Sequence, residues 1–457
     1  MALASVAQMV GRKEHQELFE RSGAPMFLAR IAQGGKHPQV EEQAMVALGR
    51  LTGMDGVLQV MRAAPCHKPV IRGGLISLAE LVDEGSNDTE ELLRMPMVLR
   101  YLMRLRAAME EPQAIVVCRQ KCAAAISAII RCLAPHAPPG VLSEMDEAME
   151  EILHSLDPPS LRCSNVASAA ETLVEALGRA ALLNDGWRDA LRSRGAVERA
   201  SAIIRGVHGQ RRLTKYTFWL SASLVGLPFV VHEMQHNPQS AEIADAAFCT
   251  LIDILDDDLE GDWALRYTDQ CSAEEIPRTI GLISSVMDRH PEDHVLQSRG
   301  CHCIGLLVPM APMSQDLARV VIHAVFEALR LHGKKVEVVR DAFYVFRAIL
   351  DLSSSAQARA EPLVALLRER HAEEVAAQAL RDFAGQHESA LLEDAATTLA
   401  ALSGTAELLA LLDAAAPDSS LRACGVKALF EFGRQHPQVL REGKDQVAKF
   451  LGKIAAE

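Results

Sequence analysis

Aromatic side chains are scarce in this 457-residue chain, although hydrophobic residues are plentiful. Phe, Tyr and Trp together make up 4% of the residues, whereas hydrophobic residues as a whole make up 49%. A core of this composition is filled by Ala, Leu, Val and Ile, and such small side chains favour close packing of helices. No stretch alternates apolar and polar residues for long enough to predict a strand. The composition therefore predicts an all-α protein.

Long hydrophobic runs are also missing. No segment approaches 18 uninterrupted apolar residues, so the sequence predicts no insertion into a membrane. The apolar stretch at residues 1–10 is short and is followed at once by charged residues, which is unlike a secretory signal.

Basic residues are too few for a general nucleic-acid binder. The 47 Lys and Arg residues are outnumbered by 60 Asp and Glu, which gives a formal net charge of −13. A protein that binds the phosphate backbone needs a basic surface. A local basic strip at residues 205–215 and an acidic run at residues 256–262 are interpreted as solvated segments. The sequence thus predicts no nucleic-acid partner, and no cofactor is expected.

The ten cysteines do not form a disulfide framework, because most of them fall inside apolar helical patterns. Cys301 and Cys303 flank His302, but consecutive helical positions point about 100° apart and cannot all face one metal ion. We therefore interpret Cys303 as a core residue. This use of cysteine predicts a reducing compartment, with the cytoplasm as the first choice and the nucleus as the alternative.

The chain does contain a recurring helical pattern. An apolar residue is followed by a small residue four places later and by apolar residues eight and eleven places later. These positions lie on one face of a helix, and the small residue lets a neighbouring helix approach closely. Ser221 is the one polar residue in the apolar stripe. The starting residues of the pattern are Val40, Val70, Cys118, Val166, Leu213, Ile243, Leu296, Val338, Leu391 and Leu421.

The spacing and one well-formed unit indicate a repeat family. Successive starts are 30 to 53 residues apart, about 42 on average, which is the period of armadillo and HEAT repeats. Residues 22–53 read SGAPMFLARIAQGGKHPQVEEQAMVALGRLTG. The Gly-Ala-Pro entry, the His37-Pro38 turn and the long helix of this unit resemble armadillo repeats, as found in catenins and importin alpha. Pro25 and Pro38 suit first helical turns, and Gly34 is expected to end the helix between them.

This resemblance implies an all-α, right-handed α-solenoid of armadillo-like repeats. A single array of about ten irregular units is predicted over residues 1–457. Residues 1–10 are interpreted as a partial repeat or cap, and residues 435–457 as a C-terminal capping helix. Because the first repeat is incomplete, a regulatory armadillo arm of a larger signalling protein is an alternative.

The resemblance also implies a binding groove lined by the long helix of each unit. Its exposed positions lie three, six and ten places after each start, and they include aromatic and arginine residues, which interaction hot spots favour. The predicted groove residues are Gln43, Arg50, Tyr216, Trp219, Arg299, His302, Asp341 and Tyr344. Burial of Trp219 in the core is the alternative for that residue. The function predicted is a non-catalytic scaffold or adaptor that binds peptide or helical segments of protein partners.

The importin alpha branch of the family is not expected. The paired tryptophan and asparagine of that groove would fall at Val46 and Arg50, and no other unit has the pair. A receptor for nuclear localisation signals is therefore not predicted.

One motif points to a different class of function. His232, Glu233 and His236 match H-E-x-x-H, in which two imidazoles on one helical face hold zinc and the glutamate acts as general base. Pro238 follows two residues later and is expected to end the helix near His236. The sequence does not define a third ligand. A zinc-dependent hydrolase is the alternative function that this motif supports.

Overall fold

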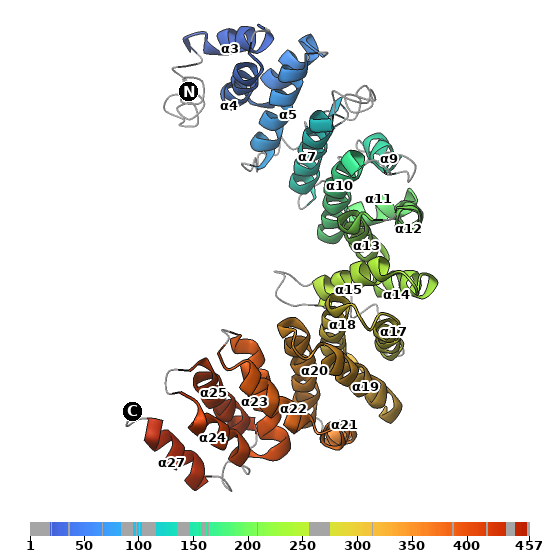
Figure 1. The fold of residues 1–457 in the computed structure, drawn as a ribbon. Helices are drawn as coiled ribbons and strands as arrows, with labels where there is room; N and C mark the ends of the chain where they lie inside the picture. Colours follow the sequence, from blue (N-terminus) through green and yellow to red (C-terminus); the bar gives the residue numbers. More distant parts are fainter. Residues whose placement is uncertain are drawn as a thin grey trace. The chain divides into compact units, whose positions relative to one another are not determined.

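Figure 1 shows the computed structural model of the chain, in which every described element is a helix. The described residues are 19, 21–34, 37–65, 67–83, 95–96, 98–99, 101–102, 116–134, 146–154, 156, 161, 164–207, 209–255, 275–312, 314–355, 357–385, 388–416, 419–435 and 444–454. None of the helices searched within these ranges has the length and apolar character needed to cross a bilayer. The prediction of an all-α fold is confirmed.

The chain divides into two compact units, Met1–Gly226 and Leu227–Glu457. The helices of the first unit are α3 (Ala24–Gln33), α4 (Pro38–Ala63), α5 (Lys68–Asp83), α7 (Val116–Leu133), α9 (Asp146–His154), α10 (Ser164–Leu183), α11 (Asp185–Ser193), α12 (Ala196–Gly206) and α13 (Arg211–Val225). The helices of the second unit are α14 (Leu227–His236), α15 (Ala241–Leu255), α17 (Glu275–Arg289), α18 (His294–Leu307), η2 (Val308–Met310), α19 (Gln315–His332), α20 (Val336–Ser355), α21 (Gln357–Glu369), α22 (Ala372–Asp382), α23 (Ser389–Ser403), α24 (Thr405–Ala414), α25 (Ser420–Gln435) and α27 (Lys444–Ile454).

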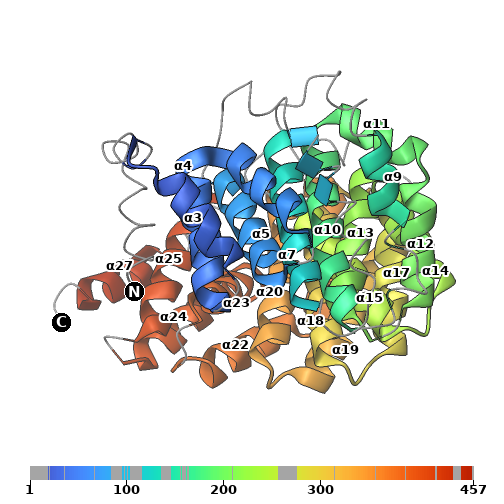
Figure 2. The ribbon, with the colours of Figure 1, turned by 90° about the horizontal axis from the view of Figure 1, so that it is seen from above.

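The helices that carry the recurring pattern form one layer in each unit, and we call them the repeat helices. In the first unit they are α4, α5, α7, α10 and α13, and each packs on the next, as the side-by-side helices of Figure 2 show. In the second unit they are α15, α18, α20, α23 and α25, again packed in that order. The second layer of this unit consists of α14, α17, α19, α21, α22, α24 and α27, which we call the flanking helices. Each unit is thus a stack of helical repeats, while assignment to the armadillo family and to a single array stays a prediction.

The small residue of the pattern faces the flanking helix of its own repeat. Gly300 of α18 lies against Met287 of α17, and a Cβ atom added to Gly300 would come within 2.5 Å of the Met287 sulfur. Gly425 of α25 meets Leu412 of α24 in the same way. Seven other repeats have Ala, Cys or Thr at this position, each with 0% of its surface exposed. Protein interiors are close-packed, so a larger side chain here would push the two layers apart.

Ser221, the exception in the apolar stripe, is accommodated by its own helix. It is fully buried in α13, and its hydroxyl donates a hydrogen bond to the Thr217 carbonyl at 2.9 Å. The Thr217 hydroxyl in turn donates to the Leu213 carbonyl at 2.7 Å. Bonds of this kind to the preceding turn satisfy hydroxyl groups within a helix. The polar residue therefore leaves no unpaired hydroxyl in the core at this point.

The first repeat begins both of its helices, and ends the first of them, where the sequence predicts. Pro25 lies in the first turn of α3, and Gly34 is the C-cap of that helix. The next helix, α4, begins at Pro38. The backbone N–H of His37, the N-cap, donates to the Glu41 carboxylate in the first turn at 3.2 Å.

A glycine turn after the repeat pattern was not predicted; in α4 it is a kink within the helix, which continues to Ala63. Gly53, Gly226 and Gly404 each lie thirteen places after a start, and their φ angles are 66°, 92° and 85°. Their ψ angles are −162°, −167° and 177°, so all three adopt one conformation. This region of backbone angles is open almost only to glycine. The signal was present in the sequence as glycine at one repeat position in three units.

The two predicted terminal segments are only partly described. Residues 1–10 lie outside the described residues. Within residues 435–457 the structure contains α27, which packs against α24 and buries Phe450. That α27 caps the array stays a prediction.

The glycine turn gives a test of the fold. We expect Gly404→Ala to lower the free energy of unfolding by about 1–3 kcal/mol, because alanine is strained at these backbone angles. Gly281→Ala is the matched control, since Gly281 lies inside α17 and an added Cβ would meet no atom within 4 Å. It should raise stability by up to about 1 kcal/mol. Urea unfolding followed by circular dichroism measures both changes, and equal effects would contradict the assigned turn.

Candidate functional site

Four of the predicted groove residues meet on two adjacent repeat helices of the second unit. Arg299 and His302 come from α18, and Asp341 and Tyr344 come from α20. The His302 and Tyr344 rings stack with their centroids 5.1 Å apart and an interplanar angle of 26°. The His302 Nδ1 atom lies 3.3 Å from the Asp341 carboxylate. We call the stacked rings of His302 and Tyr344 the ring pair.

Asp341 holds the His302 ring of the ring pair in place. The side chain is buried, and it accepts hydrogen bonds from the Ser298 hydroxyl and from the Arg340 guanidinium, the latter at 3.2 Å. With His302 it therefore has three partners, as a buried carboxylate requires. Asp341 is a positioning residue for His302 and presents little surface to a partner.

Ser298, His302 and Asp341 are the residue types of a catalytic triad, but they are not arranged as one. The Ser298 hydroxyl donates to the Asp341 carboxylate, whereas a nucleophilic serine is activated by donating to an imidazole. His302 and Ser298 thus share one carboxylate and are not arranged as base and nucleophile.

The two cysteines beside His302 belong to the core, as predicted for Cys303. Both side chains are fully buried. Burial raises the pKa of the Cys301 and Cys303 thiols, and the nearby negative charge of Asp341 adds to this effect. Both thiols are therefore protonated at neutral pH, and the Cys303 thiol donates to the Phe248 carbonyl at 3.4 Å.

Arg299 and Tyr344 also connect neighbouring repeat helices. The Arg299 guanidinium forms an ion pair with Asp245 of α15, and the two side chains are 35% and 21% exposed. The Tyr344 ring covers Gly305 of α18, where an added Cβ would come within 2.5 Å of a ring carbon. The predicted groove residues of this unit are thus fixed by contacts within the stack.

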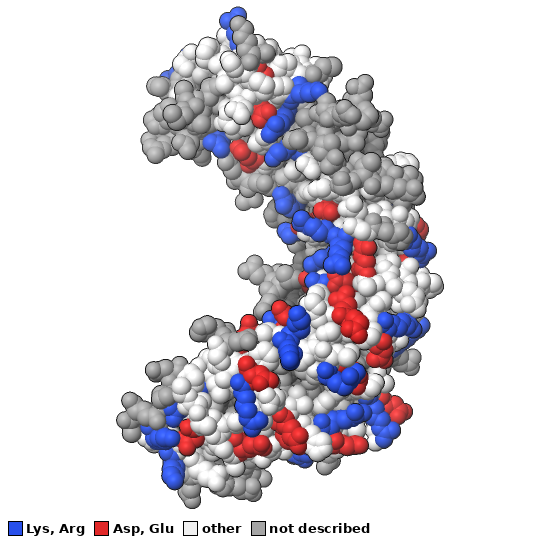
Figure 3. Space-filling view, in the orientation of Figure 1, with Lys and Arg blue, Asp and Glu red and all other residues white. Residues whose placement is uncertain are grey.

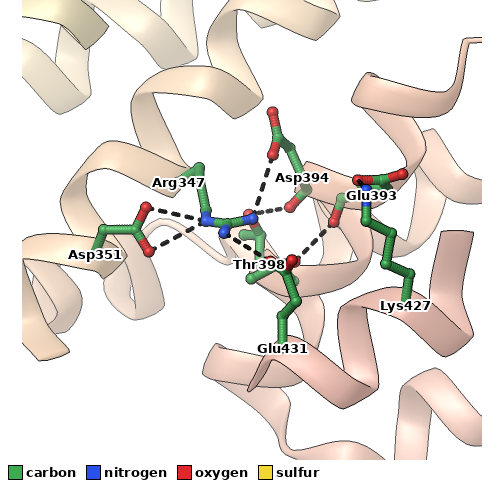
Figure 4. A network of polar contacts seen from close by, with 8 residues as sticks. Arg347, Asp351, Glu393, Asp394, Thr398, Lys427 and Glu431 are labelled. Atoms are coloured by element: carbon green, nitrogen blue, oxygen red, sulfur yellow. Dashed lines mark hydrogen bonds and ion pairs between the residues drawn. The ribbon is translucent and has the colours of Figure 1, made fainter. Parts of the chain in front are cut away.

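A second polar cluster, which the sequence did not predict, lies farther along the same layer (Figure 4). Arg347 of α20 binds Asp351 on its own helix at 3.1 Å. It also contacts Asp394 of α23 at 3.6 Å and Glu431 of α25 at 3.2 Å. One guanidinium therefore faces three carboxylates from three successive repeat helices.

Asp394 is the most perturbed carboxyl group of this cluster. Burial raises its pKa to about 7. Arg347 opposes this rise, and the negative charges of Glu393, Asp351 and Glu431 add to it. The charge of Arg347 does not offset the rise in the pKa of Asp394 that comes from loss of hydration and from repulsion by the neighbouring carboxylates.

Charged side chains also pair between successive repeats in the first unit. Glu42 and Arg72 lie two places after their starts and are 3.4 Å apart. Arg50 and Glu80 lie ten places after the same starts and are 3.3 Å apart. Opposite charges at equal repeat positions are the sequence signal that would have found these pairs. Arg50, predicted as a groove residue, is therefore engaged with the next repeat.

The remaining predicted groove residues lie at separate places in the first unit. Gln43 is exposed on α4, whereas Tyr216 and Trp219 are half-buried on α13. The six-membered ring of Trp219 covers Gly178 of α10, where an added Cβ would come within 2.7 Å of it. Trp219 thus combines the two interpretations, since it packs on the preceding repeat helix and is only half-buried. Because α5, α7 and α10 lie between α4 and α13, the structure does not bring these residues together.

The H-E-x-x-H motif lies on α14, which ends at His236 as predicted. The rings of His232 and His236 lie 4.0 Å apart at an angle of 30° and face each other rather than converge. Glu233 is fully buried, and its carboxylate lies 3.4 Å from His232 Nδ1 and 3.4 Å from Asn237 Nδ2. Within the part of the chain that the structure describes, no three His, Cys, Asp or Glu side chains are grouped to hold a metal ion.

Charges of both signs are interspersed on the face of the second unit seen in Figure 3. Neither the basic nor the acidic residues form a broad patch there. A surface of this kind gives no strong long-range attraction for charge of one sign.

The raised pKa of Asp394 predicts a pH-dependent stability. Folding raises the pKa of this carboxyl from 3.8 to about 7, so the protonated form stabilises the fold at low pH and this contribution is lost as the pH rises through that window. Asparagine does not titrate. As the pH rises from about 4 to 8, the free energy of unfolding of Asp394→Asn should therefore increase by about 2–4 kcal/mol relative to that of the wild type. Urea unfolding over this range measures it, and a constant difference would contradict the assignment.

The geometry of α14 predicts that the motif does not retain zinc. Purified protein dialysed against a weak chelator should contain well under one zinc per chain, and His232→Ala should leave that content unchanged. A structural or catalytic zinc site needs three or four convergent protein ligands. Metal analysis by mass spectrometry decides the question, because stoichiometric zinc that is lost in the variant would restore the hydrolase alternative.

Comparisons with known proteins return little. No protein-family model matches the chain, and no curated protein matches it. Among solved structures, an engineered protein is similar at 14% identity and a TM-score of 0.38, with 94% of this chain and 98% of that chain covered. A circular tandem repeat protein with a novel repeat topology and enhanced subunit contact surfaces is similar at 15% identity and a TM-score of 0.30, with 96% and 100% covered.

Proposed function

We propose that this chain is a non-catalytic scaffold or adaptor of armadillo type, and that it binds a segment of a partner protein over the ring pair of α18 and α20. The stacking of His302 on Tyr344, fixed from below by Asp341, is the observation that carries this proposal. Interaction hot spots favour aromatic and arginine side chains that lie in well-packed surroundings.

The ring pair is already ordered before a partner arrives. His302 is held by stacking and by its contact with Asp341, and Tyr344 is held over Gly305. Immobilising a free side chain on binding costs about 0.5–1.5 kcal/mol. A partner that covers these rings avoids most of that cost, because the side chains lose little freedom.

The charges around the ring pair define the chemistry of the partner segment. Arg299 and Arg340 are 35% and 42% exposed, whereas their partners Asp245 and Asp341 are 21% and 5% exposed. The arginines are therefore the more exposed charges of the rim that a partner meets. We infer that the bound segment has an apolar or aromatic residue that covers the rings and a carboxylate that reaches one of the two arginines.

The reducing compartment remains part of this proposal. Cys301, Cys303 and Cys424, within the part of the chain that the structure describes, have free thiols. Buried free thiols suit the cytoplasm, where thiols are kept reduced.

Site-specific photo-cross-linking tests the binding face. With p-benzoylphenylalanine in place of His302, ultraviolet light should join the chain to a partner in native extract. The matched control has the same probe in place of Val320, which is 40% exposed on the flanking helix α19. The partner identified at His302 should then bind the Tyr344→Ala protein at least tenfold more weakly, about 1.4 kcal/mol. Cross-links at Val320 alone, or at neither position, would overturn the proposal.

A further inference from the structure

The outer face of α14 presents two histidines that the proposed function does not use. His232 and His236 lie one turn apart on the same side of the helix. The His232 side chain is 53% exposed, and His236 is exposed as well. Two imidazoles at this spacing are the part of the H-E-x-x-H motif that holds a metal ion.

The contacts of His236 determine which of its nitrogens faces outward. Its Nδ1 atom lies 2.8 Å from the His232 carbonyl oxygen. A carbonyl oxygen only accepts, so Nδ1 carries the proton of this hydrogen bond. In a neutral imidazole the other nitrogen then has the lone pair that a metal ion needs. The lone pair of His236 is therefore on Nε2, on the side of the ring away from that carbonyl.

The His232 ring is oriented in the same sense by a carboxylate. The Glu233 side chain is 0% exposed, and its carboxylate lies 3.4 Å from the His232 Nδ1 atom. Histidines that bind a metal ion almost always donate their other ring N–H to a carboxylate or to a backbone carbonyl. This pair has one partner of each kind, and within the described residues neither Nε2 atom has a hydrogen bond.

A second pair of neighbouring histidines lacks this arrangement. The rings of His294 of α18 and His332 of α19 lie 6.2 Å apart. The Nε2 atom of His332 is engaged with the Pro291 carbonyl oxygen at 2.7 Å. The two rings of α14 are closer together, and both of their Nε2 atoms are available. Proximity of two histidines alone does not produce the arrangement on α14.

The separation of the two α14 rings suits adjacent positions on one ion. Imidazole nitrogens bind Zn²⁺ at about 2.0–2.1 Å, so two ligand atoms that meet at a right angle lie about 3 Å apart. The rings are 4.0 Å apart and inclined by 30°. A small rotation of these exposed side chains brings both Nε2 atoms to one ion, and such rotations are fast at a protein surface.

We propose that His232 and His236 form an exchangeable site for one divalent ion of the nickel, copper and zinc group, with two protein ligands and with water at the other positions. Imidazole suits these ions, whereas Mg²⁺ is bound by oxygen ligands. Two protein ligands hold an ion reversibly, which agrees with the expected loss of zinc on dialysis.

Glu233 is a positioning residue of this site and not a general base. In a zinc hydrolase the glutamate of the motif acts on the water that the metal ion binds. Here the carboxylate is buried and contacts the Nδ1 atom of His232, whereas the ion binds at Nε2. The site therefore holds a metal ion without the hydrolytic arrangement.

Titration calorimetry of the full chain, without a histidine tag, tests the site. At neutral pH, NiCl₂ should bind the wild type at one more site than it binds the double variant His232→Ala, His236→Ala. Either single variant should weaken binding at this site at least tenfold, because only one ligand remains. MgCl₂ should give no binding at this site. Both histidines are exposed, so the melting curves of these variants should match that of the wild type.

Two further variants complete the test. His323→Ala is the matched control, because His323 is an exposed histidine on α19, outside the pair, and its loss should leave the affinity of this site for Ni²⁺ unchanged. Glu233→Gln should weaken Ni²⁺ binding about tenfold, since loss of a partner that orients a ligand has an effect of this size.

Three results would overturn the proposal. The first is equal binding of Ni²⁺ by the wild type and the double variant. The second is an equal loss of affinity in His323→Ala, which would show that surface histidines bind the ion without regard to their spacing. The third is binding of Mg²⁺ that the double variant lacks, since imidazole would then not be what selects the ion.

Discussion

The close contact between each repeat helix and its flanking helix is the constraint on which the rest of the structure depends. At Gly300 the Met287 side chain occupies the space that a Cβ atom would need. Packed helices have axes about 8–10 Å apart, and the distance depends on the side chains at the contact. A small residue at this position in every repeat lets each repeat helix approach its neighbour closely. Their edges then lie opposite one another, which allows Arg50 to reach Glu80.

The number of donors around a buried carboxylate decides what each polar cluster does. Asp341 has a serine, a histidine and an arginine as partners, and it serves to fix the ring pair. Asp394 shares the single guanidinium of Arg347 with two other carboxylates, and burial raises its pKa. Two carboxylates at the same repeat position therefore have different roles. One holds a surface in place, and the other makes the stack sensitive to proton concentration.

The sequence predicted the repeat helices and much of their order, because helical periodicity records which side of a helix is buried. It predicted that Arg299, His302, Asp341 and Tyr344 share a face, but not that the histidine stacks on the tyrosine. Stacking depends on how far one helix is shifted along the next, and periodicity within a helix does not contain that distance. For the same reason the sequence did not predict the Arg347 cluster, whose members come from three helices. The glycine turn at Gly404 was missed for another reason, since the pattern was followed only to the eleventh place.

A stack of similar helices uses one kind of contact for cohesion throughout. The apolar stripe is shared by all ten repeat helices, so it favours the addition of a helix without selecting among helices. Selection has to come from the edges, where charges differ from one repeat to the next. At the ninth place after its start α20 has Arg347, which reaches Asp394 of α23, whereas α25 has Phe430. Lys427 of α25 pairs with Glu393 of α23 at 2.7 Å, so the charges at the edges differ from one repeat to the next and fix which helices lie side by side.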